Sequence, residues 1–147
     1  MKQTLVIAGA ILFGAFTSCT PEPEIIDSSQ PQGTFTAAET GMFVDDNGAG
    51  STGNAEVGTD EEGTTFLRFD SNFNTNLATG TVTVYLSTSP EFVASPGEGN
   101  PDLYLVGGVQ NAGENYFKLD PAPGDQFTHV LLWCGSVGVR FGYAELQ

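Results

Sequence analysis

The sequence predicts an all-β protein, an antiparallel β-sandwich of jelly-roll or Greek-key type with about eight short strands. Two observations support this prediction. First, short stretches of alternating apolar and polar residues recur along the chain, separated by clusters of Gly, Asn, Asp and Pro. Second, the 147 residues include 19 glycines, 8 prolines and 11 phenylalanines, a turn-rich composition with the aromatic residues that sheets favour. We expect no helix of appreciable length.

The alternation predicts the strands in order along the chain. Weak strands come first, and the clearest is 80–87 (GTVTVYLS), in which Val82, Val84 and Leu86 face one way and threonines and Tyr85 the other. The predicted strands are 34–36, 41–44, 54–58, 64–69, 80–87, 103–106, 115–119, 127–134 and 137–146. Loops are expected at 45–53, 88–101 and 120–125, and a turn at 59–63.

Residues 1–18 predict an export signal. Lys2 precedes an apolar run at 5–16, which is too short to span a bilayer of about 30 Å as a helix. The segment ends FTSC, which resembles a bacterial lipobox, and this implies cleavage before Cys19 and acylation of its thiol. Two or three acyl chains anchor a protein stably where one does not. The alternative is an ordinary signal peptide cut near Ala15, which leaves Cys19 as a free thiol.

Residues 19–32 are a predicted tether between this anchor and a single domain at 33–147. Positions 20–32 (TPEPEIIDSSQPQ) contain three prolines, three acidic residues and no apolar face, a composition typical of extended chain. At about 3 Å per residue the tether holds the domain up to about 40 Å from the membrane. We therefore predict a lipoprotein of the cell envelope, anchored in the outer membrane on its periplasmic or its surface side.

The charge of the chain argues against two kinds of partner. With 18 acidic and 4 basic residues the formal net charge is −14, so no basic surface exists to neutralise nucleic-acid phosphates or anionic lipid. Two acidic loops offer oxygen ligands for calcium, but neither has the spaced pattern of a calcium loop, and solvated turns are the favoured interpretation. These loops are Asp45, Asp46 and Asn47, and Asp60, Glu61 and Glu62.

Other chemistry has little support in the sequence. His129 is the single histidine, and with Cys134 it cannot complete a four-ligand zinc site, so no metal site is predicted. No nucleophile and base occur at a catalytic spacing, and an enzyme is not predicted.

The last 21 residues predict a hairpin with a two-residue turn at Gly135-Ser136. In this register one face is apolar and is expected to be core: Val130, Leu132, Cys134, Val137, Val139, Phe141 and Tyr143. The other face comprises His129, Leu131, Trp133, Gly138, Arg140, Gly142 and Ala144. There Trp133 lies over the glycines, and Arg140 is close enough for a cation–π contact. Cys134 and His129 point to opposite faces, unless a bulge separates them.

Cys134 is the unpaired thiol of the mature chain if Cys19 is acylated. Most cysteines of oxidising compartments are paired, so a lone thiol needs an explanation. Residue chemistry favours a small buried side chain whose burial raises the thiol pKa. The basic residues left after processing are Arg68, Lys118 and Arg140, and in this register Arg140 lies on the opposite face from the thiol.

The terminal segment also resembles the end of the DM-thirteen domain, in Trp133-Cys134 followed by Phe141-Gly142, Ala144 and Leu146. The resemblance covers about 33–146. The upstream segments that agree are Gly33-Thr34-Phe35, Phe66-Leu67-Arg68-Phe69 with Asn72-Phe73, Val84-Tyr85-Leu86-Ser87, and Gly113-Glu114-Asn115-Tyr116 before Leu119. The family usually has a Gly-Pro-Asp element before the VYLS-like strand, and this chain departs from it with Ala78-Thr79-Gly80-Thr81.

The resemblance implies an electron-transfer role for Cys134, as a bare thiol or as a ligand of a prosthetic group such as haem, and a redox or surface protein as partner. The axial ligands available for haem are Cys134, His129 and Met42. Candidate neighbours of the thiol are Trp133, His129 and Arg140, although the hairpin register places His129 and Arg140 on the opposite face. The competing hypothesis is a non-catalytic binding or structural β-sandwich in which Cys134 is buried and inert.

Overall fold

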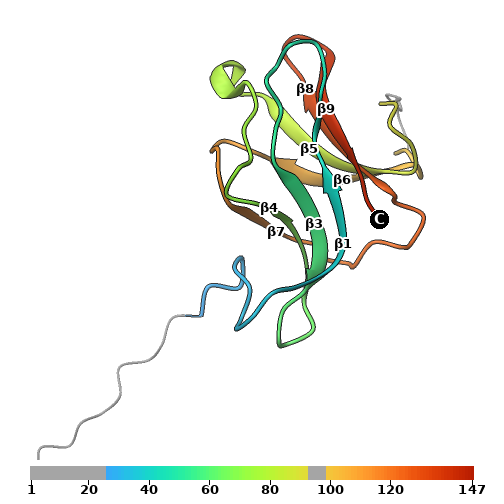
Figure 1. The fold of residues 1–147 in the computed structure, drawn as a ribbon. Coiled ribbons are helices and arrows are strands. Elements are labelled where there is room, and N and C mark those ends of the chain that lie inside the picture. Colours follow the sequence, from blue (N-terminus) through green and yellow to red (C-terminus); the bar gives the residue numbers. More distant parts are fainter. Residues whose placement is uncertain (1–25, 93–98) are drawn as a thin grey trace, which may run out of the picture.

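The computed structural model describes residues 26–92 and 99–147, and it confirms the all-β sandwich. Two antiparallel sheets face each other (Figure 1), with strand orders β1-β3-β4-β7 and β2-β9-β8-β5-β6. The elements are β1 (Thr36–Met42), β2 (Val44–Asp45), β3 (Asn54–Thr59), β4 (Thr65–Phe69), the 3-10 turn η1 (Leu77–Thr79), β5 (Val82–Ser87), β6 (Leu103–Gly108), β7 (Asn115–Lys118), β8 (His129–Cys134) and β9 (Val139–Glu145).

Most of the predictions for the N-terminal segment concern residues outside the described ranges. The export signal, Cys19 and the first part of the tether lie outside the described ranges. Within those ranges, no helix has the length and apolarity needed to cross a membrane.

The core lies between the sheets and follows the predicted alternation. In β5, Val82, Val84 and Leu86 are at most 2% exposed, whereas Thr83 and Tyr85 are half-buried on the outer side. Strand β8 contributes Val130, Leu132 and Cys134 to the same core. The period-2 pattern therefore predicted correctly which faces of β5 and β8 point inward.

The first strand differs from its prediction, because one continuous segment replaces two weak ones. Strand β1 pairs with β3, and then Phe43 enters the core and the chain continues as β2 in the other sheet. Phe43 is 5% exposed, and its ring centroid lies 5.1 Å from that of Phe69 and 5.4 Å from that of Phe73. Burial of this aromatic ring therefore accompanies the change of sheet.

The β8–β9 hairpin has a different register from the predicted one. Four residues, Gly135–Gly138, form the turn, so Cys134 pairs with Val139 and not with Val137. Gly138 has φ +76°, which suits glycine, and its N–H donates to the Cys134 carbonyl at 2.8 Å. Val137 is 60% exposed at the turn, so its predicted place in the core is wrong.

A bulge in β9 changes the faces of the residues beyond it. The register shifts between Leu132 and Trp133, and Leu131 then pairs with Tyr143 while Val130 pairs with Ala144. Ala144 is fully buried in the core, and Tyr143 lies on the outer side, the reverse of the prediction for both residues. The predicted burial of Leu132 and Phe141 is confirmed.

Candidate functional site

Cys134 is the last residue of β8, directly before the β8–β9 turn, and its side chain points into the space between the two sheets. Its side chain has no exposed surface and belongs to the hydrophobic core. The four turn residues, Gly135–Gly138, follow it immediately and are all exposed. The thiol is therefore buried, with only a short turn between it and solvent.

Side-chain hydroxyls surround the sulfur. The Sγ atom of Cys134 lies 3.5 Å from Thr81 Oγ1 and 3.5 Å from Ser136 Oγ. Thr81 Oγ1 donates to Ser136 Oγ at 2.8 Å and accepts the Ser136 backbone N–H at 3.1 Å. Thr81 also accepts the Gly135 N–H on its backbone carbonyl at 3.0 Å. Thr81 therefore both fixes the turn by hydrogen bonds and contacts the thiol.

These contacts change the acidity of the thiol. Burial raises the pKa of Cys134, but hydrogen bonding with the side chains of Ser136, Thr79 and Thr81 and with the Val137 N–H outweighs burial and lowers the pKa to about 6. A thiolate accepts hydrogen bonds more strongly than a thiol, so donors around the sulfur favour the ionised form. Residue chemistry predicted the effect of burial correctly and missed the hydroxyls that outweigh it.

Two residues that the sequence analysis did not place near the thiol are Thr79 and Thr81. They lie in the segment where the chain departs from the Gly-Pro-Asp element of the DM-thirteen domain. Thr79 closes η1, and Thr81 immediately precedes β5, whose first residue, Val82, pairs with Cys134. This pairing brings residues 79–81 to the end of β8, although Thr81 and Cys134 are 53 positions apart. The signal in the sequence that could have indicated these neighbours of the thiol was the departure from the Gly-Pro-Asp element, because Thr79 and Thr81, which stand in its place, hydrogen-bond with the thiol.

The predicted neighbours of Cys134 do not converge on it. His129 is at the far end of β8, and its pairing with Ser87 places it on the outer side of the sheet. Trp133 and Arg140 pair with each other, also on the outer side. The predicted Trp133–Arg140 cation–π contact is replaced by a cation–π contact of Arg140, whose guanidinium lies 4.8 Å from the Tyr143 ring centroid, and by aromatic stacking of Trp133 on Phe92.

Arg140 connects β9 to two irregular segments. Its guanidinium donates to Asp46 Oδ2 at 2.7 and 2.8 Å, just after β2. It also donates to the Pro90 carbonyl and lies 3.8 Å from Glu91 Oε1. The same segment carries Phe92, whose ring centroid is 4.0 Å from that of Trp133. Arg140 therefore helps to hold the residues that cover the outer side of the Cys134 strand.

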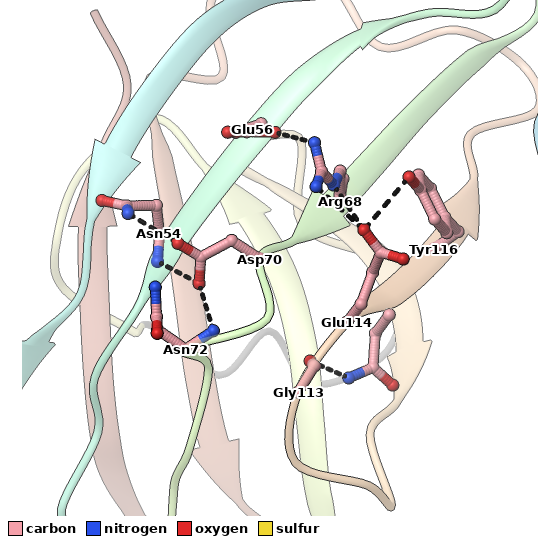
Figure 2. Close-up of polar contacts among 9 residues, drawn as sticks. Asn54, Glu56, Arg68, Asp70, Asn72, Gly113, Glu114 and Tyr116 are labelled. Atoms are coloured by element: carbon pink, nitrogen blue, oxygen red, sulfur yellow. Dashed lines mark hydrogen bonds and ion pairs between the residues drawn. The ribbon is translucent and has the colours of Figure 1, made fainter. Parts of the chain in front are cut away.

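The other arginine belongs to the outer face of the four-stranded sheet. Figure 2 shows Arg68 between Glu56 of β3 and Glu114, which precedes β7, at 3.1 and 2.8 Å. Its guanidinium also lies 5.8 Å from the ring centroid of Tyr116 and 5.9 Å from that of Phe35. Every partner of Arg68 is thus a neighbour on the same sheet face or adjoins it, remote from Cys134.

The acidic loops are organised by their own backbones. Asp60 is 6% exposed and accepts N–H groups from Gln32, Glu62 and Thr64 at 2.8–3.0 Å, so the prediction of a solvated turn is wrong for this residue. Asp45 accepts the Ser51 N–H at 2.8 Å. In the described ranges, no group of three or more His, Cys, Asp or Glu side chains is arranged to hold a metal ion.

The haem ligands suggested by the sequence do not fit a haem site. Met42 is 72% exposed on β1, and His129 faces away from the core that contains Cys134. A cavity between the sheets is lined by Leu86 at the opposite end of β5 and does not include Cys134. Since neither Met42 nor His129 reaches the sulfur, the axial-ligand pairs suggested by the sequence do not form, and the arrangement of the described residues fits a bare thiol.

Comparison with protein families then identifies the domain. A β-sandwich with a hydroxyl-surrounded thiol at one end defines a candidate redox domain. The family model described as electron transfer DM13 matches residues 42–146, and the chain belongs to this family. The match confirms the resemblance to the DM-thirteen domain and begins nine residues after the start expected from the sequence. Neither a curated protein nor a solved structure matches the chain.

Proposed function

We propose that the protein is a thiol-based electron-transfer module of the cell envelope, in which Cys134 is the redox group. The observation that supports this most is the ring of hydroxyls around Sγ, which lowers the pKa of the thiol to about 6. At pH 7 a thiol of that pKa is about nine-tenths ionised. Membership of an electron-transfer family supports the same assignment.

The chemistry open to a single thiolate is exchange with a disulfide. Sγ attacks one sulfur of a partner's disulfide, a new S–S bond forms to Cys134, and the partner's second sulfur leaves as a thiolate. A thiolate of a second partner, a dithiol, then attacks the Cys134 sulfur of the mixed disulfide and releases the first partner's remaining sulfur as a thiolate. The second partner's other thiol attacks its own sulfur in the new mixed disulfide, forms that partner's disulfide and releases Cys134 as the thiolate, so that two electrons pass from the second partner's dithiol to the first partner's disulfide.

The turn controls access to this reaction. Because Cys134 has no exposed surface, a reagent reaches Sγ only when Gly135–Gly138 moves aside. Two hydrogen bonds to Thr81 hold the turn, from the N–H groups of Gly135 and Ser136. Opening the turn breaks contacts of a few residues only, so a partner that binds the turn is able to expose the sulfur.

The experiment uses the Cys19→Ala chain, in which Cys134 is the remaining thiol. We expect its alkylation rate by iodoacetamide to rise with pH around a midpoint near 6, and Thr81→Val and Ser136→Ala to move the midpoint upward. Thr83→Val removes a hydroxyl from the opposite face of β5 and is the matched control, with an unchanged midpoint. A native midpoint near 9, equal to that of urea-unfolded protein, would show that the hydroxyls do not activate the thiol.

The second candidate function is a binding or structural sandwich, favoured by the complete burial of Cys134. In that case native Cys134 is protected from alkylation by orders of magnitude at every pH, relative to unfolded protein. It also fails to exchange with small aromatic disulfides.

The membrane anchor is the remaining part of the proposal, and its support is the lipobox-like end of the export segment at Cys19. We expect Cys19→Ala to move the protein from the detergent phase to the aqueous phase in phase-partitioning measurements. The domain should keep its cooperative unfolding, because residues 33–147 contain every strand of the sandwich that the structure describes. If the variant still partitions into detergent, the anchor lies elsewhere.

A further inference from the structure

A cavity of about 190 Å³ opens at the end of the sandwich opposite Cys134. Its walls come from both sheets: Val57 from β3 and Leu86 from β5, with Phe127 from the connection between β7 and β8. Cys134 pairs with Val82, four residues before Leu86, which corresponds to about 13 Å along β5. In Figure 1 this connection lies at the lower right of the sandwich and the β8–β9 turn at the top.

The fold holds these walls in place. A bulge in β1 at Ala38 interrupts its pairing with β3, and both Ala38 and Glu39 line the cavity. On the other side, Tyr104 donates its hydroxyl to the Pro121 carbonyl at 2.9 Å and packs edge-on against Phe127. The cavity is thus formed by a strand irregularity and a loop held by a hydrogen bond, and ligand sites are usually preformed in this sense.

The lining combines apolar walls with carboxylates of one sign. Val57, Leu86 and Phe127 provide aliphatic and aromatic surface, and Glu39 and Asp125 are exposed side chains at the lining. No lining residue is basic, and within the described ranges neither carboxylate has an ion-pair partner. The net charge of −14 adds to the negative potential there.

We infer that this cavity binds a small organic cation, an ammonium group carried on a short apolar body. An enclosed apolar cavity of about 150 Å³ accommodates benzene, so the apolar part is about the size of one aromatic ring. Its ammonium group lies near Glu39 and Asp125, and Phe127 adds a cation–π contact. This site does not involve Cys134, so it stands independently of the proposed redox function.

The test titrates the exported protein with three ligands that share one ring: benzylammonium, benzyl alcohol and benzoate. Calorimetry gives the affinities, and methyl NMR spectra locate the site. We expect benzylammonium to bind in the millimolar range and to shift the methyl signals of Val57 and Leu86. Benzyl alcohol should bind at least about fivefold more weakly, and benzoate not measurably, because the carboxylates attract only the cation.

Charge-removing variants make the test specific to the cavity. Glu39→Gln and Asp125→Asn should each weaken benzylammonium about two- to fivefold and leave benzyl alcohol unchanged, as expected for exposed charge pairs. Glu62→Gln removes the same charge from an exposed turn and should change neither affinity. The inference is overturned if benzylammonium does not bind, if it binds no better than benzyl alcohol, or if the shifted signals lie outside the cavity.

Discussion

The two arginines of the chain, one on the outer face of each sheet, have similar partners and different structural consequences. Arg68 and Arg140 each form ion pairs with carboxylates and a cation–π contact with an aromatic ring. Arg68 joins β3, β4 and the start of β7, which are already hydrogen-bonded neighbours in one sheet. Arg140 instead joins β9 to Asp46 and to residues 90–91, which lie outside the strands.

This difference separates stabilisation of a sheet from positioning of loops. A contact between paired strands adds to order that the backbone already provides. A contact to an irregular segment supplies order that the segment otherwise lacks, because few backbone hydrogen bonds hold it. The Arg140 cluster is also the one beside the Cys134 hairpin. Loss of Arg140 should therefore change local dynamics, and loss of Arg68 should change mainly global stability.

The largest expected effect tests whether both outer faces are packed like a core. Phe66, on the Arg68 side, is 1% exposed and contacts Tyr116, and Leu131, on the Arg140 side, is fully buried, yet both lie outside the central cluster. Phe66→Ala should cost about 3–5 kcal/mol of unfolding free energy and Leu131→Ala about 2–5 kcal/mol, measured by urea unfolding. Losses below 1 kcal/mol would mean that the neighbouring side chains on the outer faces cover Phe66 and Leu131 without packing closely against them.

A smaller effect distinguishes the two arginines directly. Arg68→Met and Arg140→Met keep a long apolar side chain and should each cost about 1 kcal/mol, since both guanidinium groups are partly exposed. Amide hydrogen exchange should accelerate at residues 88–92 in Arg140→Met and stay unchanged there in Arg68→Met. If both variants, or neither, accelerate exchange in that segment, the loop-positioning role of Arg140 is wrong.

A third prediction concerns the thiol and the dependence of stability on pH. The folded pKa of Cys134, about 6, is below the ordinary value of 9.0 for a free thiol, so between these values the folded state binds fewer protons than the unfolded state. The unfolding free energy should therefore rise from pH 6 to pH 9, and this contribution is lost as the pH falls through 6. Cys134→Ala should remove this rise relative to the parent protein. Arg140→Met should retain it, because Arg140 lies on the other side of the sheet; a loss in that variant would make Arg140 a counter-ion of the thiolate.

The hairpin shows where sequence reasoning succeeds and fails. The inward position of Cys134 follows from the alternation of side chains along β8. It therefore does not depend on the register in which β8 pairs with β9. The turn could not be predicted, because Gly135-Ser136-Val137-Gly138 suits both a two-residue and a four-residue connection. The bulge near Trp133 then reversed the faces of Tyr143 and Ala144, and no local pattern indicates such a bulge.

The site was harder to predict than the fold, for a related reason. Cys134 was identifiable as an unpaired cysteine, but the acidity of a thiol depends on what surrounds it. Two of the three hydroxyls come from Thr79 and Thr81, which only the pairing of β5 with β8 brings near the sulfur. The third, from Ser136, depends on the conformation of the unpredicted turn. Local periodicity contains no information about such cross-strand neighbours.

The positions of the two ends of the sandwich have a consequence for orientation. The chain enters the domain beside the β3–β4 turn, where the N–H groups of Gln32 and Thr34 donate to Asp60 and Glu61. In Figure 1 this entry point is at the bottom of the molecule, and the β8–β9 turn that covers Cys134 is at the top. If the N-terminal segment fastens the protein to a surface, the domain stands on that surface with its thiol at the distal tip. A partner arriving from the surrounding fluid then meets the turn first, and one embedded in the same surface does not.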